Sequence, residues 1–266
     1  MLVSEIYIYP VKSFGGISLQ SAAVTDRGLQ YDRRWMLVDE SGRFLTQREL
    51  PALALLQVAV NDHYLTIQHK QATVPPLTIP IKPEQVEMHP VTIWTDRCEA
   101  INTGKEAATW FFELLGVRCN LVYMPEQSMR RVDPIYALNN EITNFSDGYP
   151  FMMIGQASLD DLNKRLPVPL PTNRFRPNIV FSGGQPYQED ELKSFKIGTI
   201  SFFGVKRCGR CVIITIDQEN LSRGKEPLKT LAGYRTEDNT VFFGQNLLHR
   251  GEGRISVGDR LEVIYN

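Results

Sequence analysis

Val3-Ser4-Glu5-Ile6-Tyr7-Ile8-Tyr9 is a short run of β-branched and aromatic residues that ends at a proline, and similar runs recur along the chain. Short runs of this composition, bounded by turn residues, are typical of β-strands. The others that we predict as strands are residues 34–38, 55–60, 64–67, 178–181, 199–203 and 260–264. Many short strands favour curved sheets or barrels over a doubly wound parallel sheet.

Two helices are expected among these strands. Residues 105–115 carry apolar side chains at helical spacing, and we expect Gly116 to end this helix. Residues 158–166 predict a second helix, in which Ser158 and Asp161 form the acidic version of a capping box. The sequence therefore predicts a mostly β protein with a few helices, in the α+β class.

One long stretch divides the chain. Residues 125–150 are rich in Asp, Asn, Pro and Ser, a composition typical of an ordered loop or of a crossing between two substructures. We therefore expect two domains, formed by residues 1–122 and 123–266.

Composition narrows the class of protein. The chain has 266 residues, a formal net charge of -1 and 42% hydrophobic residues, which suits an ordinary globular protein and gives no electrostatic footprint for nucleic acid. Its apolar stretches fall far short of the roughly 20 residues that cross a bilayer. The first residues lack the cationic start and apolar body of a secretory signal. We expect a cytoplasmic protein with reduced cysteines and neither membrane nor nucleic acid as a partner.

Two thiols lie beside cations, immediately before an apolar run, in the segment Lys206-Arg207-Cys208-Gly209-Arg210-Cys211-Val212-Ile213-Ile214. Neighbouring cations stabilise a thiolate. Zinc binding is disfavoured because the other cysteines and the histidines show no paired ligand spacing. Thioredoxin-like chemistry is disfavoured because we predict that residues 212–216 form a strand, not a helix. Two interpretations of this segment remain open. One thiolate could bind the metal of a cofactor while arginines hold the anionic parts of that cofactor. Alternatively, both cysteines could be half-buried thiols at the end of a strand, without a ligand.

Three other clusters combine polar side chains at strand ends. Tyr9-Pro10-Val11-Lys12-Ser13 can present an ammonium, a hydroxyl and nearby backbone N–H groups to an anion. In Asp32-Arg33-Arg34-Trp35, strand alternation sends the two arginines to opposite faces, so at most one faces a given pocket. In Phe175-Arg176-Pro177-Asn178 the arginine precedes a proline, which predicts an extended backbone. Each cluster alone is equally compatible with a solvated turn.

The order of these clusters is more specific than any one of them. The clusters occur in one order with four further motifs: Trp94-x-Asp96, Phe145-Ser146-Asp147, Cys208-Gly209-Arg210-Cys211 and Thr215-x-Asp217. With all of these motifs in this order, the sequence resembles the MOSC family. The similar members carry an N-terminal β-barrel domain, and they include the mitochondrial amidoxime-reducing component and bacterial relatives. The resemblance implies a MOSC β-barrel core preceded by a β-barrel-type domain.

The resemblance also implies a molybdenum cofactor, in which a metal is held by the dithiolene of a molybdopterin and by one protein thiolate. By this resemblance the thiolate ligand is expected to be Cys211, and Cys208 matches a neighbouring cysteine that does not bind the metal. The residues that match cofactor-binding positions are Lys12, Ser13, Arg33, Arg176, Asn178, Gly209 and Arg210. The cationic members suit a phosphate, and soft sulfur suits the metal.

The implied activity is reduction of N-hydroxylated small molecules such as hydroxylamines, amidoximes and N-hydroxylated nucleobases. Asp147 and Asp217 are candidate proton donors on their position in the chain alone. The residues that end the chain, 261–266, are followed by no C-x4-C-x2-C iron–sulfur motif, so we expect electrons from a separate ferredoxin-, flavodoxin- or cytochrome-type protein.

Two other functions remain open. MOSC domains also occur at the end of molybdenum-cofactor sulfurases, so a cofactor carrier or sulfur-transfer protein is the alternative. A noncatalytic protein that has lost the cofactor is the other possibility. Retention of the cations and of Cys211 argues against it, because buried cations without an anionic partner cost stability.

Overall fold

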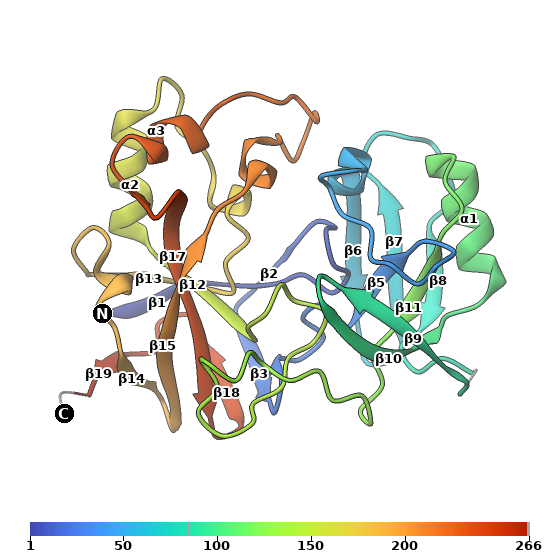
Figure 1. Ribbon diagram of the computed structural model, residues 1–266, viewed down its shortest axis with the longest axis horizontal. Coiled ribbons are helices and arrows are strands. Elements are labelled where there is room, and N and C mark those ends of the chain that lie inside the picture. The colour runs from blue at the N-terminus through green and yellow to red at the C-terminus, as the bar shows by residue number, and fades with distance from the viewer. Residues whose placement is uncertain (85, 265–266) are drawn as a thin grey trace.

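Two groups of strands lie side by side in the computed structural model, which describes residues 1–84 and 86–264 (Figure 1). Gln85, Tyr265 and Asn266 lie outside the described residues. Seven of the eight strands predicted from the sequence begin within one residue of an observed strand, and the exception is residues 212–216. The predicted mostly β fold with a few helices is therefore confirmed.

The larger group is built on a nine-stranded sheet. Its path runs β19-β14-β15-β17-β12-β13-β1-β2, and β16 pairs with β17 beside that path. The strands are β1 (Leu2–Ile8), β2 (Ile17–Leu19), β12 (Phe151–Gly155), β13 (Ile179–Ser182), β14 (Ser194–Ile197), β15 (Ile200–Gly209), β16 (Thr236–Glu237), β17 (Thr240–Arg250) and β19 (Leu261–Val263). Its buried apolar side chains include the stacked rings of Phe195 and Phe202, 5.5 Å apart between centroids.

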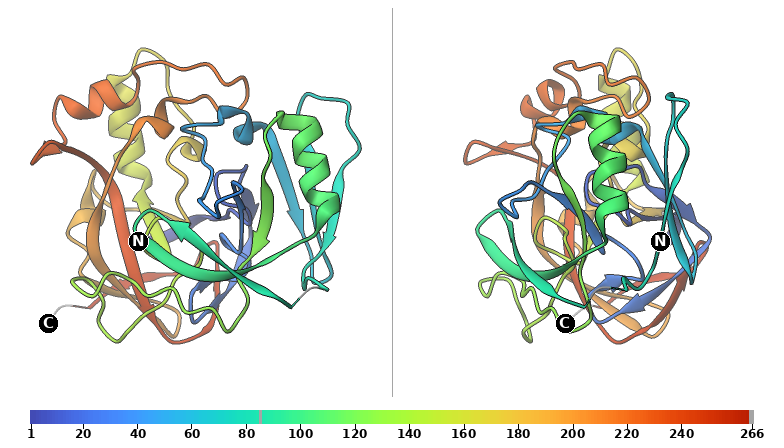
Figure 2. Two further views of the ribbon diagram at one scale, coloured as in Figure 1. Left: turned by 45° about the vertical axis from the view of Figure 1, so that its right-hand side comes forward. Right: turned by 90° about the vertical axis from the view of Figure 1, so that its right-hand side faces the viewer.

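The smaller group contains two further sheets. One has the order β5-β11-β10-β9, and the other has the order β6-β7-β8. The strands are β5 (Trp35–Val38), β6 (Leu56–Val60), β7 (Tyr64–His69), β8 (Leu77–Pro80), β9 (Met88–Ile93), β10 (Asp96–Asn102) and β11 (Asn120–Tyr123). Figure 2 shows α1 (Lys105–Leu115) on the outside of this group, where it contacts β8 and β11. The predicted stop is confirmed, since Gly116 ends α1 in the left-handed conformation at φ 67°.

The start of the chain belongs to the larger group. Strand β1 pairs antiparallel with β13, and β3 (Ser21–Thr25) pairs with β18 (Gly253–Ser256) and β4 (Gly28–Leu29) in a third small sheet. The turn after β1 contributes Val11 and Phe14 to the core of the smaller group, but the strands of that group begin only with β5. The chain returns through residues 125–150, a fully described stretch with no helix or strand beyond an isolated bridge between Arg131 and Ile142. The N-terminal turns thus lie between the two groups.

The helix α2 (Gln156–Arg165) connects the parallel strands β12 and β13. The predicted capping box at its start is wrong, because α2 begins two residues earlier, after Gly155. Ser158 lies inside the helix and is buried, where its hydroxyl donates to Glu189 Oε2 at 2.7 Å. The remaining helical turns are η1 (Pro51–Leu55), η2 (Thr172–Arg174), η3 (Gln188–Asp190), η4 (Val212–Thr215) and α3 (Leu228–Ala232). Across the described residues we find no helix that is long and apolar enough to span a bilayer.

Candidate functional site

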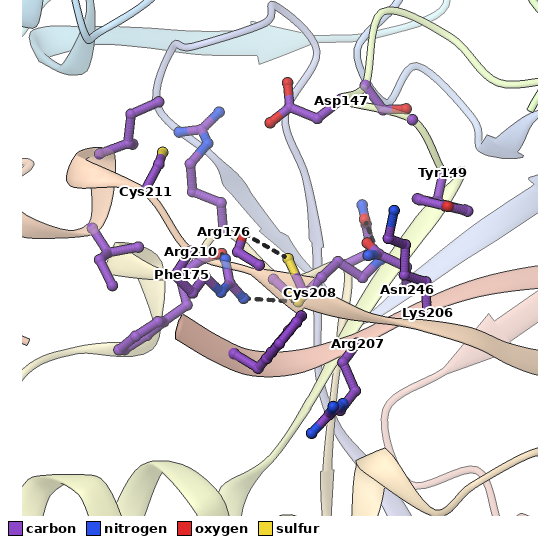
Figure 3. Close-up of a pocket in the computed structure, with 18 of the residues that line it drawn as sticks. Asp147, Tyr149, Phe175, Arg176, Lys206, Arg207, Cys208, Arg210, Cys211 and Asn246 are labelled. Atoms are coloured by element: carbon purple, nitrogen blue, oxygen red, sulfur yellow. Dashed lines mark hydrogen bonds between the residues drawn. The ribbon is translucent and has the colours of Figure 1, made fainter. Parts of the chain in front are cut away.

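A cavity of about 480 Å³ lies where the N-terminal turns meet the end of β15 (Figure 3). Its walls come from distant parts of the sequence: the turn after β1, the loop after β5, the end of the 125–150 stretch, the start of β13 and the residues around Cys211. Nine of the ten predicted site residues line it, and these are Lys12, Ser13, Arg33, Asp147, Arg176, Asn178, Gly209, Arg210 and Cys211. The fold therefore gathers nearly all of the predicted site.

The cavity is strongly cationic. Asp147 is the one carboxylate residue among the described residues that line it. Eight lining residues carry a positive charge: Lys12, Arg33, Arg48, Arg174, Arg176, Lys206, Arg207 and Arg210. Such an excess of one charge at a concave surface favours an anionic ligand.

Three residues form what we call the arginine sandwich: Tyr9, Arg33 and Arg176. The guanidinium carbons of both arginines lie 4.3 Å from the centroid of the Tyr9 ring. Arg33 donates to Asp32 Oδ2 at 2.6 Å, and Arg176 donates to the carbonyl of Phe14 at 2.7 Å. Burial lowers the pKa of Arg176 to about 10, so its guanidinium stays charged at neutral pH.

The backbone at this point is strained. Arg33 and Arg176 have φ of 49° and 57°, in the left-handed region that non-glycine residues rarely adopt. The predicted extended conformation of Arg176 is therefore wrong, because its stacking on Tyr9 and its bond to Phe14 override the preference of a residue before proline. Ser13, which also lines the cavity, has φ of 70°. Strained residues of this kind cluster at functional sites.

The prediction that at most one of the two adjacent arginines faces a given pocket is confirmed. Arg33 lines the cavity, whereas Arg34 donates to Tyr123 Oη at 2.8 Å and to Glu126 Oε1 at 2.8 Å. Asn178 is buried and supports Arg33, because its Oδ1 accepts a hydrogen bond from Arg33 Nη1 at 3.1 Å. It positions the arginine in addition to lining the cavity.

Lys12 and Asp147 form an ion pair between the turn after β1 and the end of the 125–150 stretch. The Lys12 ammonium donates to Asp147 Oδ1 at 2.6 Å and to the carbonyl of Phe145 at 2.8 Å. Burial lowers the pKa of Lys12 to about 8, although the carboxylate opposes that change. Desolvation raises the pKa of Asp147, but the ammonium outweighs it and holds that pKa well below its usual range. Asp147 is therefore ionised at neutral pH, a state that suits it to holding Lys12 rather than to donating a proton.

A second cluster, which we call the thiol corner, consists of Arg48, Trp94 and Cys211. Arg48 Nη2 donates to Cys211 Sγ at 3.2 Å, and the Arg48 guanidinium stacks on the Trp94 ring at 4.5 Å. No sequence motif marks Arg48. It lies in a loop with no neighbouring motif, so its position beside Cys211 arises from the tertiary fold alone.

The residues before Cys211 are fixed by other contacts. The Arg210 guanidinium is bound by other groups of the protein, since it donates to the carbonyls of Phe243 and Phe175 at 2.7 and 2.9 Å and to Met152 Sδ at 3.2 Å. Gly209 lies close to Thr240, whose Cγ2 would be 2.9 Å from an added Cβ. Burial raises the pKa of Cys208, which therefore stays a thiol. Arg210 and Gly209 thus shape the wall of the cavity.

The predicted strand after Cys211 is wrong, because residues 212–215 form the 3-10 turn η4. Asp217, the tenth predicted site residue, lies beyond this turn and is not among the residues that line the cavity. Its carboxylate accepts from Arg174 Nη1 at 3.1 Å and from the backbone N–H of Glu219 at 2.9 Å. Its contacts stabilise the loop after Cys211.

Comparisons with known proteins agree with this architecture. Residues 1–118 match the family described as the MOSC N-terminal beta barrel domain, and residues 140–262 match the MOSC domain. The predicted boundary at residues 122 and 123 stays a prediction.

Similar proteins are matched over nearly the whole chain. Mitochondrial amidoxime-reducing component 1 of Mus musculus is 34% identical over 98% of this chain and 82% of its own length. The protein of the same name from Homo sapiens is 32% identical over the same shares. A molybdenum cofactor sulfurase of Oryza sativa subsp. japonica is 31% identical over 98% of this chain but 34% of its own length. The chain therefore belongs to the MOSC family, among the members in which a MOSC N-terminal β-barrel domain precedes the MOSC domain.

Proposed function

We propose that this protein is a molybdenum-cofactor-dependent oxidoreductase that reduces N-hydroxylated compounds with electrons from a separate redox protein. The observation that carries the proposal is the half-buried thiol of Cys211 in the wall of a cavity with eight cationic residues and one carboxylate residue among its described lining. The names of the amidoxime-reducing relatives support the substrate class.

The residues fit such a cofactor in two respects. Lys12, Arg33 and Arg176 offer charge-assisted hydrogen bonds to a phosphate, and the strained backbone around them is held in place before any ligand binds. Cys211 offers the soft sulfur ligand that a thiophilic metal prefers. When bound, the cofactor supplies an electron-transferring metal that accepts an oxygen atom.

The proposed reaction balances as a two-electron reduction. The N–O bond of an N-hydroxylated substrate breaks, two electrons and two protons are taken up, and the products are the amine and water. The electrons come from a separate ferredoxin-, flavodoxin- or cytochrome-type protein. Within the chain, Asp147 keeps the Lys12 ammonium oriented, while Asn178 and Asp32 hold Arg33 in place.

A cofactor carrier or sulfur-transfer protein is the second candidate. It is favoured by the 31% identity with the rice molybdenum cofactor sulfurase, which extends over almost all of this chain. The cavity described above suits either function, because both require the cofactor to be bound.

The decisive experiment measures metal and pterin content together with reductive turnover. Protein from a cofactor-competent host is assayed with an aromatic amidoxime, a hydroxylamine and N-hydroxycytosine, with reduced viologen as the electron donor. Protein from a host that cannot make the cofactor is the control. Near-stoichiometric molybdenum with turnover supports the reductase, whereas bound cofactor without turnover favours the carrier. Absence of both metal and pterin after reconstitution would overturn both proposals.

A further inference from the structure

We propose that Arg48 is a positioning residue that acts through the Cys211 sulfur and raises the reduction potential of a metal bound there. This inference rests on the proposed function. Its direct observation is the 3.2 Å contact from Arg48 Nη2 to Cys211 Sγ. Among the cationic residues described around the cavity, Arg48 alone donates a hydrogen bond to this sulfur.

Arg48 is held from behind by an aromatic ring. Its guanidinium stacks 4.5 Å from the centroid of Trp94, and Trp94 has a left-handed backbone at φ 55°. The Trp94 indole N–H in turn lies 3.4 Å from Asp147 Oδ1. A planar guanidinium stacked on an indole keeps its N–H groups in one plane, so its direction toward the sulfur is fixed.

The backbone beside Arg48 is fixed as well. Gln47 is fully buried, and its Nε2 donates to the carbonyl of Ser13 at 2.6 Å. The side-chain amides of Gln47 and Gln218 also pair reciprocally at 3.1 Å. Gln218 donates to the carbonyl of Ile216, within the loop that follows Cys211. The amide pair therefore ties the Arg48 segment to the loop after η4, and η4 begins immediately after Cys211.

A hydrogen bond to a ligating sulfur withdraws electron density from it. The sulfur then donates less charge to the metal, so the reduced metal is favoured and the reduction potential rises. A positive donor strengthens this effect relative to a neutral one. Removal of Arg48 should therefore make the metal harder to reduce while leaving the phosphate contacts of the arginine sandwich in place.

The test compares cofactor-loaded Arg48→Ala and Arg48→Lys with wild type and with Arg207→Ala. Arg207 is a matched control, since it lines the same cavity and stacks on Phe242 at the same 4.5 Å but donates to Glu237 instead of to sulfur. Redox titrations are followed by metal absorption and by the paramagnetic half-reduced state. For Arg48→Ala we expect about a tenfold fall in the ratio of reduced to oxidised metal at fixed potential, equivalent to about 59 mV for one electron.

The other variants sharpen the result. Arg48→Lys should recover part of the shift because it keeps a cationic donor, and Arg207→Ala should shift the ratio less than threefold. Trp94→Leu should shift the ratio in the same direction as Arg48→Ala, and the double variant should match Arg48→Ala alone. Potentials and absorption spectra that are equal in wild type and Arg48→Ala would overturn this inference alone. A metal-free wild type would overturn the proposed function as well.

Discussion

The arginine sandwich and the thiol corner lie in the walls around one cavity, yet they are built differently. In the sandwich, two guanidinium groups stack on the buried Tyr9 ring, and both arginines have strained backbones. In the thiol corner, Arg48 and Cys211 are half-buried and Trp94 is 45% exposed. The sandwich is thus rigid before any ligand arrives, whereas the corner depends on side-chain contacts near solvent.

This difference suggests that the two regions have different functions in the proposed site. Fixed, partly desolvated cations give strong binding of an anion, because no reorganisation is needed when it arrives. Among the described residues, the polar contact of the Cys211 sulfur is with Arg48, which leaves room near solvent for a metal and a substrate. We therefore expect changes in the sandwich to affect retention of the cofactor, and changes in the corner to affect reactivity.

Cys211→Ser tests this difference in function with the largest expected effect. Turnover should fall by about 100-fold or more, since loss of residues that merely support metal ligands already costs about 10–100-fold. Pterin content should stay within about twofold of wild type because the arginine sandwich is unchanged. Both quantities are measured on the same preparations, with Cys208→Ser as the matched control. A loss of pterin in Cys211→Ser as large as its loss of turnover would show that the thiol corner also retains the cofactor.

Arg176→Ala is the complementary change. A charge-assisted hydrogen bond contributes about 1.5–3 kcal/mol, so the affinity for the cofactor should fall about 10–100-fold. Cofactor content after dialysis measures this loss, and turnover per bound cofactor should remain close to wild type. Arg165→Ala is the control, because Arg165 also stacks on a tyrosine, Tyr234, at 4.4 Å but does not line the cavity. Full retention of cofactor in Arg176→Ala would contradict the role of the sandwich.

The two regions also differ in how well the sequence predicted them. The motifs around Lys12, Arg33, Arg176 and Cys211 are local and contain unusual residue combinations, and all four side chains line the cavity. Arg48 has no such signature and meets Cys211 only because the loop after β5 packs on the loop after η4. Long-range contacts of this kind are not encoded in local spacing.

The same limit explains the local errors in the fold. Residues 212–216 have strand-like composition, but the hydrogen bond from the Ile214 N–H to the Cys211 carbonyl turns the chain instead. Ser158 resembles a helix cap, but it is buried against Glu189, and the helix starts before it. Strands and α1 were predictable because periodicity and turn residues specify them, whereas these two segments depend on tertiary partners.

A change of pH separates Lys12 from the arginines of the sandwich. Burial lowers the pKa of Lys12 to about 8, so its ammonium is mostly charged at pH 7 and mostly neutral at pH 9. Sulfate keeps a constant charge, and its affinity for metal-free protein should therefore fall about tenfold between pH 7 and pH 9. Titration calorimetry at constant ionic strength measures this change. Lys12→Arg should bind sulfate with little dependence on pH, and a flat profile in wild type would show that Lys12 does not contact the anion.

Tyr9→Phe has the smallest expected effect and tests what holds the sandwich together. The Tyr9 hydroxyl is buried with no hydrogen-bond partner among the described residues, so its removal should leave the free energy of unfolding unchanged or raise it by up to about 1 kcal/mol. Tyr9→Leu removes the aromatic faces and should lower that free energy by about 1–2 kcal/mol or more. Urea unfolding of both variants measures the difference. A loss above about 1 kcal/mol in Tyr9→Phe would mean that the hydroxyl binds a partner, and the rigidity of the sandwich would then depend on that contact as well as on the stacked ring.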